Sequence, residues 1–291
     1  MGANIRARLL HSRGMEPRTR LVRPSALGLE FEVLEGDLHI GPAIEQGGWE
    51  PHESALFRAH LEPGARVLDL GANVGWFSAL AVLAGAEVHA FEPVPAIAEV
   101  CARNLERANA RGPGRAVLHR CAAAERPGRA RIALAARNLG DNRVLDGSER
   151  PADMGAGEQI EIGLARVDDL VEGPVRVLKI DTQGSEWLAL AGMPRLLAAS
   201  PRLALLIEFW PYALRGAQPA QLLEFLARQG FVLGKATAAP YPMAPARILR
   251  QALARDPVKG GLDLYGTRGL PFHVLGLRAR LHGLWRSLRE E

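Results

Sequence analysis

The sequence predicts an α/β fold in which helices cover both faces of a mostly parallel, seven-stranded sheet. From Arg66 onward, short apolar runs alternate with longer segments of helical periodicity, the pattern of successive βαβ units. These runs contain few polar residues, as expected of parallel strands that are buried on both faces. Two further runs, at residues 230–237 and 260–268, are expected to be closing strands that form an antiparallel hairpin. With 48% hydrophobic residues over 291 positions, the chain can bury a core of that size.

Residues 1–64 are predicted to form an N-terminal extension ahead of a main domain at 65–291. In the extension, Leu27–Ile40 alternates apolar and polar residues around a turn at Gly36, which predicts a β-hairpin. Helical spacing over Pro51–Leu61 predicts a helix after it. The extension should therefore be a basic tail, a hairpin and a helix.

The main domain is expected to continue with alternating strands and helices. The expected strands are Val67–Leu70, Glu87–Phe91, Ala116–Arg120, Arg131–Leu134, Val175–Ile180 and Leu203–Phe209. The expected helices are Trp76–Leu83, Pro95–Ala110, Ser185–Leu190 and Pro219–Gln229. Residues 140–157 are rich in Gly, Asp, Asn and Ser and predict a surface loop, and residues 273–288 predict an amphipathic helix.

Composition argues against several classes of partner. Of the 36 basic residues, all except Lys179, Lys235 and Lys259 are Arg, and those clustered at the start of the chain have no aromatic residues among them, so the formal charge of +4 is weak support for nucleic acid binding. No run of about 18 apolar residues predicts a membrane span. The N-terminus lacks the apolar segment of a secretory signal, so a cytoplasmic protein is expected. Nothing in the sequence decides whether the chain forms a homo-oligomer.

A glycine-containing turn follows the first strand of the main domain. Asp69 ends that strand, and Gly71, Asn73 and Gly75 form the turn into the next helix. Glycines permit positive φ and let a ligand approach the backbone. Glu92 ends the next strand about twenty residues later, where a carboxylate can accept both hydroxyls of a ribose. The pattern predicts a nucleoside site.

The chemistry of this turn favours one nucleoside cofactor over another. Its Gly-x-Asn-x-Gly spacing lacks the third glycine of the GxGxxG register that dinucleotides use. A carboxylate at Asp69 would repel a pyrophosphate but suits a ligand with an ammonium or sulfonium charge. S-adenosyl-L-methionine carries both charges, a ribose and no phosphate. An NAD-dependent oxidoreductase and a non-catalytic cofactor-binding protein are the alternatives.

Between Trp49 and Arg268 the sequence resembles the FkbM family of S-adenosylmethionine-dependent methyltransferases. The resemblance rests on "GGWEPHE", "LDLGANVGWFS", "AFEPVP", "NLGDNRV", "VDDL", "LKIDTQGSE" and "LLIEFWPYAL". It implies a class I Rossmann-like fold and methyl transfer, with an oxygen of a sugar or small metabolite as the acceptor.

Two acidic residues are candidates for the catalytic base. Lys179 and Asp181 flank Ile180 on an apolar strand and therefore point to one face; charge is costly there unless it serves a site or forms a structural ion pair. Glu208 follows the apolar run "LALLI" at the end of another strand. It either belongs to the site or forms a buried ion pair. A positioned carboxylate that removes a hydroxyl proton typically contributes roughly 10²–10⁴-fold.

Loop residues complete the predicted site. Asp141, Asn142 and Arg143 lie in a loop that either reaches over the pocket to the acceptor or consists of solvated turn formers. Trp49 and Glu50, just before the fold proper, either contact the cofactor or form a lid. No His or Cys pair has the spacing of metal ligands, and the stretch Ala122-Ala123-Ala124 offers none, so no metal is expected.

Overall fold

The computed structural model describes residues 17–135, 140–145, 158–257 and 260–272. Three sequence predictions fall partly or wholly outside these ranges: the basic N-terminal tail, most of the surface loop at 140–157, and the amphipathic helix at 273–288. Within the described ranges, no helix is both long enough and apolar enough to cross a membrane.

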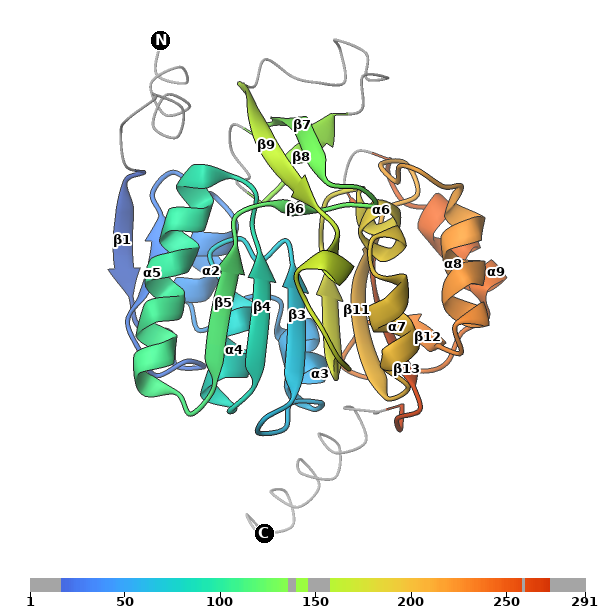
Figure 1. Cartoon of the computed structure of the whole chain (residues 1–291), viewed down its shortest axis with the longest axis horizontal. Helices are drawn as coiled ribbons and strands as arrows, with labels where there is room; N and C mark the ends of the chain where they lie inside the picture. Colours follow the sequence, from blue (N-terminus) through green and yellow to red (C-terminus); the bar gives the residue numbers. More distant parts are fainter. Residues whose placement is uncertain (1–16, 136–139, 146–157, 258–259, 273–291) are drawn as a thin grey trace, which may run out of the picture.

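A seven-stranded sheet with the order β12-β13-β11-β10-β3-β4-β5 forms the centre of the protein (Figure 1). Its strands are β3 (Arg66–Leu70), β4 (Glu87–Phe91), β5 (Arg115–His119), β10 (Val177–Ile180), β11 (Leu203–Phe209), β12 (Val232–Lys235) and β13 (Leu262–Arg268). The five strands β5, β4, β3, β10 and β11 run parallel, and β13 runs antiparallel to both β11 and β12. The predicted sheet and its closing hairpin are confirmed.

Helices pack on both faces of this sheet and divide the core in two. One core joins the sheet to α3 (Pro51–Arg58), α4 (Trp76–Leu83) and α5 (Pro95–Arg111). The second core joins the other face to α6 (Glu186–Ala191), α7 (Pro194–Ala199), α8 (Pro219–Arg228) and α9 (Pro245–Leu253). Strand residues such as Leu68 and Val67 alternate between the two cores, as the period of a strand requires. Of these helices, α7 and α9 were not predicted.

A second, four-stranded sheet lies above the ends of β3, β4 and β5 (Figure 1). It has the order β6-β9-β7-β8, with β6 at Ala122–Ala123, β7 at Gly128–Ala133, β8 at Arg143–Leu145 and β9 at Gln159–Ala165. The short helix η1 (Val167–Asp169) follows β9. The prediction that residues 131–134 extend the main sheet is wrong, and β8 and β9 were not predicted. Charged side chains alternate along β7, and a sheet that is covered on both faces excludes such a strand.

The predicted hairpin at Leu27–Ile40 is also wrong. The strand β2 (Phe31–Leu34) pairs with β1 (Thr19–Val22), which precedes it, and not with the residues after Gly36. After that turn the chain enters α2 (Ile40–Glu45). The carboxylate of Asp37 accepts hydrogen bonds from the backbone N–H groups of Gly41 at 2.6 Å and His39 at 3.4 Å, which starts a helix where alternation predicted a strand.

Candidate active site

A cavity opens at the carboxyl edge of the main sheet, where the strand order reverses between β3 and β10. Ligands of open α/β sheets bind at such a reversal. The cavity encloses about 1200 Å³, its open mouth included. Residues from the turns after β3, β4 and β10 line it, together with residues of α2, the start of α3, β8, β11 and β13.

The turn after β3 takes left-handed backbone conformations at alternate residues. The φ angles are +85° at Gly71, +50° at Asn73 and +88° at Gly75, which explains why the sequence has Gly, Asn and Gly at these positions. A Cβ atom on Gly71 would lie 1.9 Å from the carbonyl oxygen of Asp181. The turn after β3 therefore packs directly against the turn after β10. Gly75 does not line the cavity; a Cβ there would meet Cys101 of α5 at 3.1 Å.

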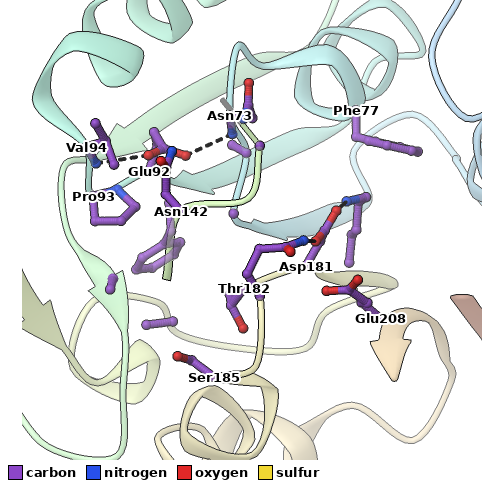
Figure 2. Close-up of a pocket in the computed structure, with 18 of the residues that line it drawn as sticks. Asn73, Phe77, Glu92, Pro93, Val94, Asn142, Asp181, Thr182, Ser185 and Glu208 are labelled. Carbon is purple, nitrogen blue, oxygen red and sulfur yellow. Dashed lines mark hydrogen bonds and ion pairs between the residues drawn. The ribbon is translucent and has the colours of Figure 1, made fainter. Parts of the chain in front are cut away.

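Glu92 is fixed at the cavity wall by two backbone donors. Asn73 N donates to Glu92 Oε2 at 3.0 Å, and Val94 N donates to Glu92 Oε1 at 2.9 Å (Figure 2). The side chain is buried, and burial raises the pKa of Glu92 to about 7. Each oxygen of an ionised carboxylate can accept about two hydrogen bonds, so Glu92 keeps acceptor capacity toward the cavity. The structure thus brings Glu92 to the turn, as expected of a ribose-binding carboxylate.

Asp69 lies beneath the turn and not in the cavity wall. It is 1% exposed, and its Oδ2 accepts a hydrogen bond from Ser78 Oγ at 2.7 Å. Burial raises the pKa of Asp69, while the ammonium of Lys179 opposes the rise. The expectation that Asp69 points at the ligand is not met, because the side chain of this strand residue is enclosed by α4.

Lys179 and Asp181 form an ion pair at the end of β10. Lys179 Nζ lies 3.0 Å from Asp181 Oδ2, and Gln183 Nε2 donates to Asp181 Oδ1 at 2.8 Å. The ammonium also lies 4.6 Å from the centroid of the Phe77 ring. Burial disfavours the charge on Lys179, but the nearby carboxylates of Asp181, Glu50 and Asp69 outweigh it and raise the pKa of the ammonium. Both predicted residues line the cavity, on one face of the strand.

Glu208 lies beside Asp181 on the neighbouring strand, also in the cavity wall. Its Oε2 atom is buried and has no hydrogen-bond partner among the described residues. Burial raises the pKa of Glu208 well above its ordinary value, and the carboxylates of Asp181, Glu186 and Asp263 add to the rise. In the free protein these effects favour the neutral form of Glu208 over the carboxylate.

Glu186 holds the loop that carries Asp181. Its Oε1 accepts hydrogen bonds from Thr182 N and Thr182 Oγ1, both at 3.1 Å, and from Gly184 N at 2.9 Å. The side chain is fully buried, and burial raises its pKa. The carboxylate of Glu186 therefore fixes the turn after β10.

The predicted acceptor loop reaches the cavity through only one of its three named residues. Gly140, Asn142 and Val144 line the cavity, whereas Asp141 and Arg143 do not. Arg143 Nε lies 2.8 Å from Asp141 Oδ1, and the guanidinium stacks 4.2 Å from the Trp210 ring centroid. Arg143 and Val144 lie in β8, where successive residues point to opposite faces, so only Val144 of these two lines the cavity.

Trp49 and Glu50 both line the cavity at the start of α3. Glu50 has φ +45°, and burial raises its pKa to about 8, with Asp181 and Asp263 adding to the rise. Sequence reasoning missed the other lining residues. These include Ile40, Phe77, Thr182, Gln183, Ser185 and Asp263. Four of the six lie within the quoted motifs, whereas Ile40 and Asp263 lie outside them, and Asp263 had no signal beyond one acid in an apolar strand.

The family is decided by a match over more than half of the chain. Residues 69–233 match the model of the methyltransferase FkbM domain, and these residues form the turns after β3, β4 and β10. The chain belongs to the FkbM methyltransferase family. S-adenosyl-L-methionine is its cofactor.

Two curated relatives match parts of this FkbM-family methyltransferase. One is the protein-L-isoaspartate O-methyltransferase of Aeropyrum pernix, 33% identical over 36% of this chain and 41% of the relative. The other is the 31-O-demethyl-FK506 methyltransferase FkbM of Streptomyces tacrolimicus, 30% identical over 46% of this chain and 61% of the relative. The chain thus matches about two fifths and three fifths of these relatives.

Solved structures of methyltransferases are similar at a lower level. The magnesium protoporphyrin IX methyltransferase of Synechocystis PCC 6803 with bound S-adenosylmethionine has 14% identity and a TM-score of 0.44, over 79% of this chain and 84% of that one. An rRNA methylase from Streptococcus thermophilus has 13% identity and a TM-score of 0.40, over 75% and 95%. Similarity at this level indicates nothing about the acceptor.

The charged groups that line the cavity of this FkbM-family methyltransferase are compatible with S-adenosyl-L-methionine. The described residues that line it include five carboxyl groups (Glu50, Glu92, Asp181, Glu208 and Asp263) and one ammonium, that of Lys179. Such a cavity repels a pyrophosphate and suits a sulfonium and an ammonium. The charge of these lining residues thus disfavours NAD, the alternative drawn from the sequence. Among the described residues there is no cluster of three or more His, Cys, Asp or Glu side chains arranged to hold a metal.

Proposed function

We propose that this enzyme transfers the methyl group of S-adenosyl-L-methionine to a hydroxyl oxygen of a sugar or another small metabolite. The observation that carries the proposal is the position of Asp181. Its carboxylate lines the cavity, is oriented by Lys179 and Gln183, and lies across the cavity from Glu92 (Figure 2). A carboxylate in this place can accept the proton of a hydroxyl acceptor.

The Glu92 side of the cavity is proposed to hold the nucleoside. Glu92 would accept the ribose hydroxyls, because its two oxygens are already oriented by Asn73 and Val94. The apolar side chains of Phe91, Val94, Ala122 and Ile132 line the same cavity and would enclose the adenine. Trp49 and Glu50, which approach from α3, would close the site over the cofactor.

The Asp181 side is proposed to bind the acceptor and remove its proton. When bound, the cofactor supplies an activated methyl group on a sulfonium that a nucleophile displaces in line. Asp181 would hold the acceptor hydroxyl and take its proton, and Lys179 would keep the carboxylate oriented and charged. Positioning contributes effective molarities of about 10⁵ M or more in good geometry. Burial disfavours the charged form of Glu208, so Asp181 rather than Glu208 is assigned as the base.

The names of the curated relatives support oxygen as the methylated atom. One is an O-methyltransferase, and the other is named for a substrate that lacks an O-methyl group. Each relative is matched over less than two thirds of its own length, so their acceptors are not carried over to this chain.

The proposal is tested by methyl transfer to a panel of small hydroxyl compounds, followed by kinetics of the Asp181→Asn variant. Asp181→Asn keeps the shape of the side chain but removes the proton acceptor. Turnover should fall by about 10²-fold or more, while S-adenosylhomocysteine binding by calorimetry stays within threefold or so of wild type. Asp169→Asn, an exposed acid that does not line the cavity, is the matched control. Unchanged turnover in Asp181→Asn would exclude Asp181 as the base.

We also propose that turnover requires no divalent metal ion. The acceptor's proton goes to a carboxylate in the scheme above, so no divalent cation is needed to lower the acceptor's pKa. Turnover should persist after exhaustive EDTA treatment, with no gain on adding Mg²⁺. Loss of turnover that Mg²⁺ restores would contradict the metal-free scheme.

A further inference from the structure

Three carboxyl groups form a row across three neighbouring strands at the acceptor side of the cavity. Asp181 follows directly after Ile180 of β10, which pairs with Ile207 of β11, so Asp181 lies beside Glu208. Glu208 in turn pairs with Asp263 of β13. Paired residues of neighbouring strands point to the same face, and all three carboxyl groups line the cavity. We call Asp181, Glu208 and Asp263 the acidic row.

The helix α3 brings further acidic groups to the same place. Glu50, at its N-terminus, lines the cavity, and Glu53 follows in its first turn. Burial raises the pKa of Glu50 to about 8 and that of Glu53 to about 7; Asp263 and Asp181 add to the rise for both. The carboxylates of Glu50 and Glu53 therefore repel those of Asp181 and Asp263 electrostatically.

Countercharge for the acidic row is scarce in the described part of the chain. Lys179 is the cation among the lining residues there, and it is already paired with Asp181. Glu208 Oε2 is buried and lacks a hydrogen-bond partner among the described residues. A buried polar atom without a partner is costly, so the binding of a complementary group at Glu208 would remove a cost that the free protein bears.

We propose that the acceptor carries a protonated amino group beside the hydroxyl that is methylated, as in an amino sugar or another small amino alcohol. This inference rests on the proposed function, which assigns the acceptor to this side of the cavity. The ammonium would lie against Glu208 and Asp263, while the neighbouring hydroxyl meets Asp181. An ammonium has only donors, and the acidic row offers acceptors and negative charge.

A neutral diol would fit the same space less well. It could hydrogen-bond to the acidic row, but it would leave the mutual repulsion of the carboxyl groups unchanged. An ammonium would offset that repulsion, because an opposite charge within about 4–6 Å favours the ionised form of a carboxyl group. For the same reason, phosphorylated or carboxylated acceptors should be excluded. The cofactor brings its sulfonium, ammonium and carboxylate to the cavity whichever acceptor is bound, so its charges do not distinguish one acceptor from another.

The test compares matched acceptors on the full-length enzyme. The pair trans-2-aminocyclohexanol and trans-cyclohexane-1,2-diol differ only in the amino group, as do glucosamine and glucose. Calorimetry measures the affinity of each for enzyme saturated with S-adenosylhomocysteine, and mass spectrometry with NMR identifies the product formed with S-adenosylmethionine. The amino alcohols should bind about tenfold more tightly or better, a difference of 1.4 kcal/mol.

Two variants show whether the acidic row causes that preference. In Glu208→Gln and Asp263→Asn, the preference for the amino alcohol should fall to about threefold or less, with binding of S-adenosylhomocysteine retained as the check on folding. Glu99→Gln, an exposed acid of α5 paired with Arg120, should keep the full preference. Equal binding of both members of each pair, or an unchanged preference in both variants, would overturn the inference.

Failure of this inference is distinguishable from failure of the proposed function. Methyl transfer to the oxygen of the diols, as fast as to the amino alcohols, would overturn the acceptor class but keep O-methylation. A product methylated on nitrogen would overturn the proposed function and keep recognition of a cation. Transfer to neither member of any pair would count against both.

Discussion

The backbone N–H of Asn73 donates a 3.0 Å hydrogen bond to the carboxylate of Glu92. This bond joins the turn after β3 to the end of β4, and it requires the left-handed conformation of Asn73. The carboxylate that is proposed to bind the ribose is thus oriented by the turn that the glycines allow. Cofactor affinity and the conformation of the turn should therefore change together when either partner is altered.

Replacing Glu92 should weaken cofactor binding without unfolding the protein. Glu92→Ala removes the acceptor proposed for two ribose hydroxyls, and hydrogen bonds to charged groups contribute roughly 1.5–3 kcal/mol each. The affinity for S-adenosylhomocysteine, measured by calorimetry, should fall by about tenfold or more. Glu99→Ala, which removes an exposed carboxylate of α5, the helix that follows Glu92, should leave this affinity unchanged. A folded Glu92→Ala protein with wild-type affinity would place the ribose elsewhere.

Asn104 should act as a positioning residue for the same turn. Its side-chain Nδ2 donates to the carbonyl oxygens of Val74 at 2.8 Å and Glu32 at 2.9 Å, so it ties the turn to β2. Asn109, five residues later on α5, bonds instead to both backbone groups of Ala116. Asn104→Leu and Asn109→Leu should both lower the melting temperature. Only Asn104→Leu should also lower the affinity for S-adenosylhomocysteine, and equal affinities in the two variants would show that Asn104 is structural alone.

Burial of Glu92 should make stability depend on pH. Burial raises its pKa from 4.5 to about 7 in the folded protein, so between these values the folded state holds a proton that the unfolded chain has lost. The free energy of unfolding should therefore fall as pH rises through this window, by up to about 1.4 kcal/mol per pH unit for this group. Other acids contribute to the wild-type slope, so the measurement is the difference from Glu92→Gln.

In chemical denaturation of the cofactor-free protein, Glu92→Gln should show a shallower decline than wild type between pH 4.5 and about 7. The variant also loses one acceptor for a backbone N–H, but that cost is independent of pH and leaves the slope difference intact. Parallel curves for the two proteins would mean that Glu92 has the same pKa in the folded and unfolded states.

Gly71 should tolerate no side chain, because two turns meet there. A Cβ atom would lie 1.9 Å from the carbonyl oxygen of Asp181, in addition to the strain of φ +85°. Gly64 has a similar φ of +74° with no atom within 4 Å of the added Cβ. Gly64→Ala should cost only about 1–2 kcal/mol, the strain of the left-handed region, whereas Gly71→Ala should cost clearly more. Equal losses in denaturant titrations would refute the contact.

The parallel strands of the main sheet could be predicted because each is an apolar run that is followed by a turn. Strands buried on both faces, such as β10 and β11, leave a continuous hydrophobic signal. The N-terminal strands and the second sheet were missed or misplaced for the opposite reason. Alternating polar and apolar residues predict a strand but do not show which strand it pairs with. After the turn at Gly36, the hydrogen bond from Gly41 N to Asp37 starts a helix where the alternation predicted a strand.

Residues of the candidate site could be predicted from the sequence where the position requires an unusual backbone conformation or places a charge in an apolar segment. Gly71, Asn73 and Glu92 belong to such a pattern, and Lys179 and Asp181 are costly in an apolar strand. Asp69 was misplaced because a strand-end residue can point into the cavity or beneath the turn, and only the packing of α4 decides between them. Asp263 could not be found from the sequence, because its position beside Glu208 depends on the pairing of β13 with β11.

The most direct test of the account is the position of the methyl group in the product. Enzyme, S-adenosylmethionine labelled with carbon-13 in its methyl group, and a small hydroxylated acceptor are incubated with and without EDTA, and carbon-13 NMR identifies the atom that becomes methylated. The account predicts an O-methyl product in both samples, and its loss in Asp181→Asn. A methyl group found on nitrogen, carbon or sulfur would contradict it.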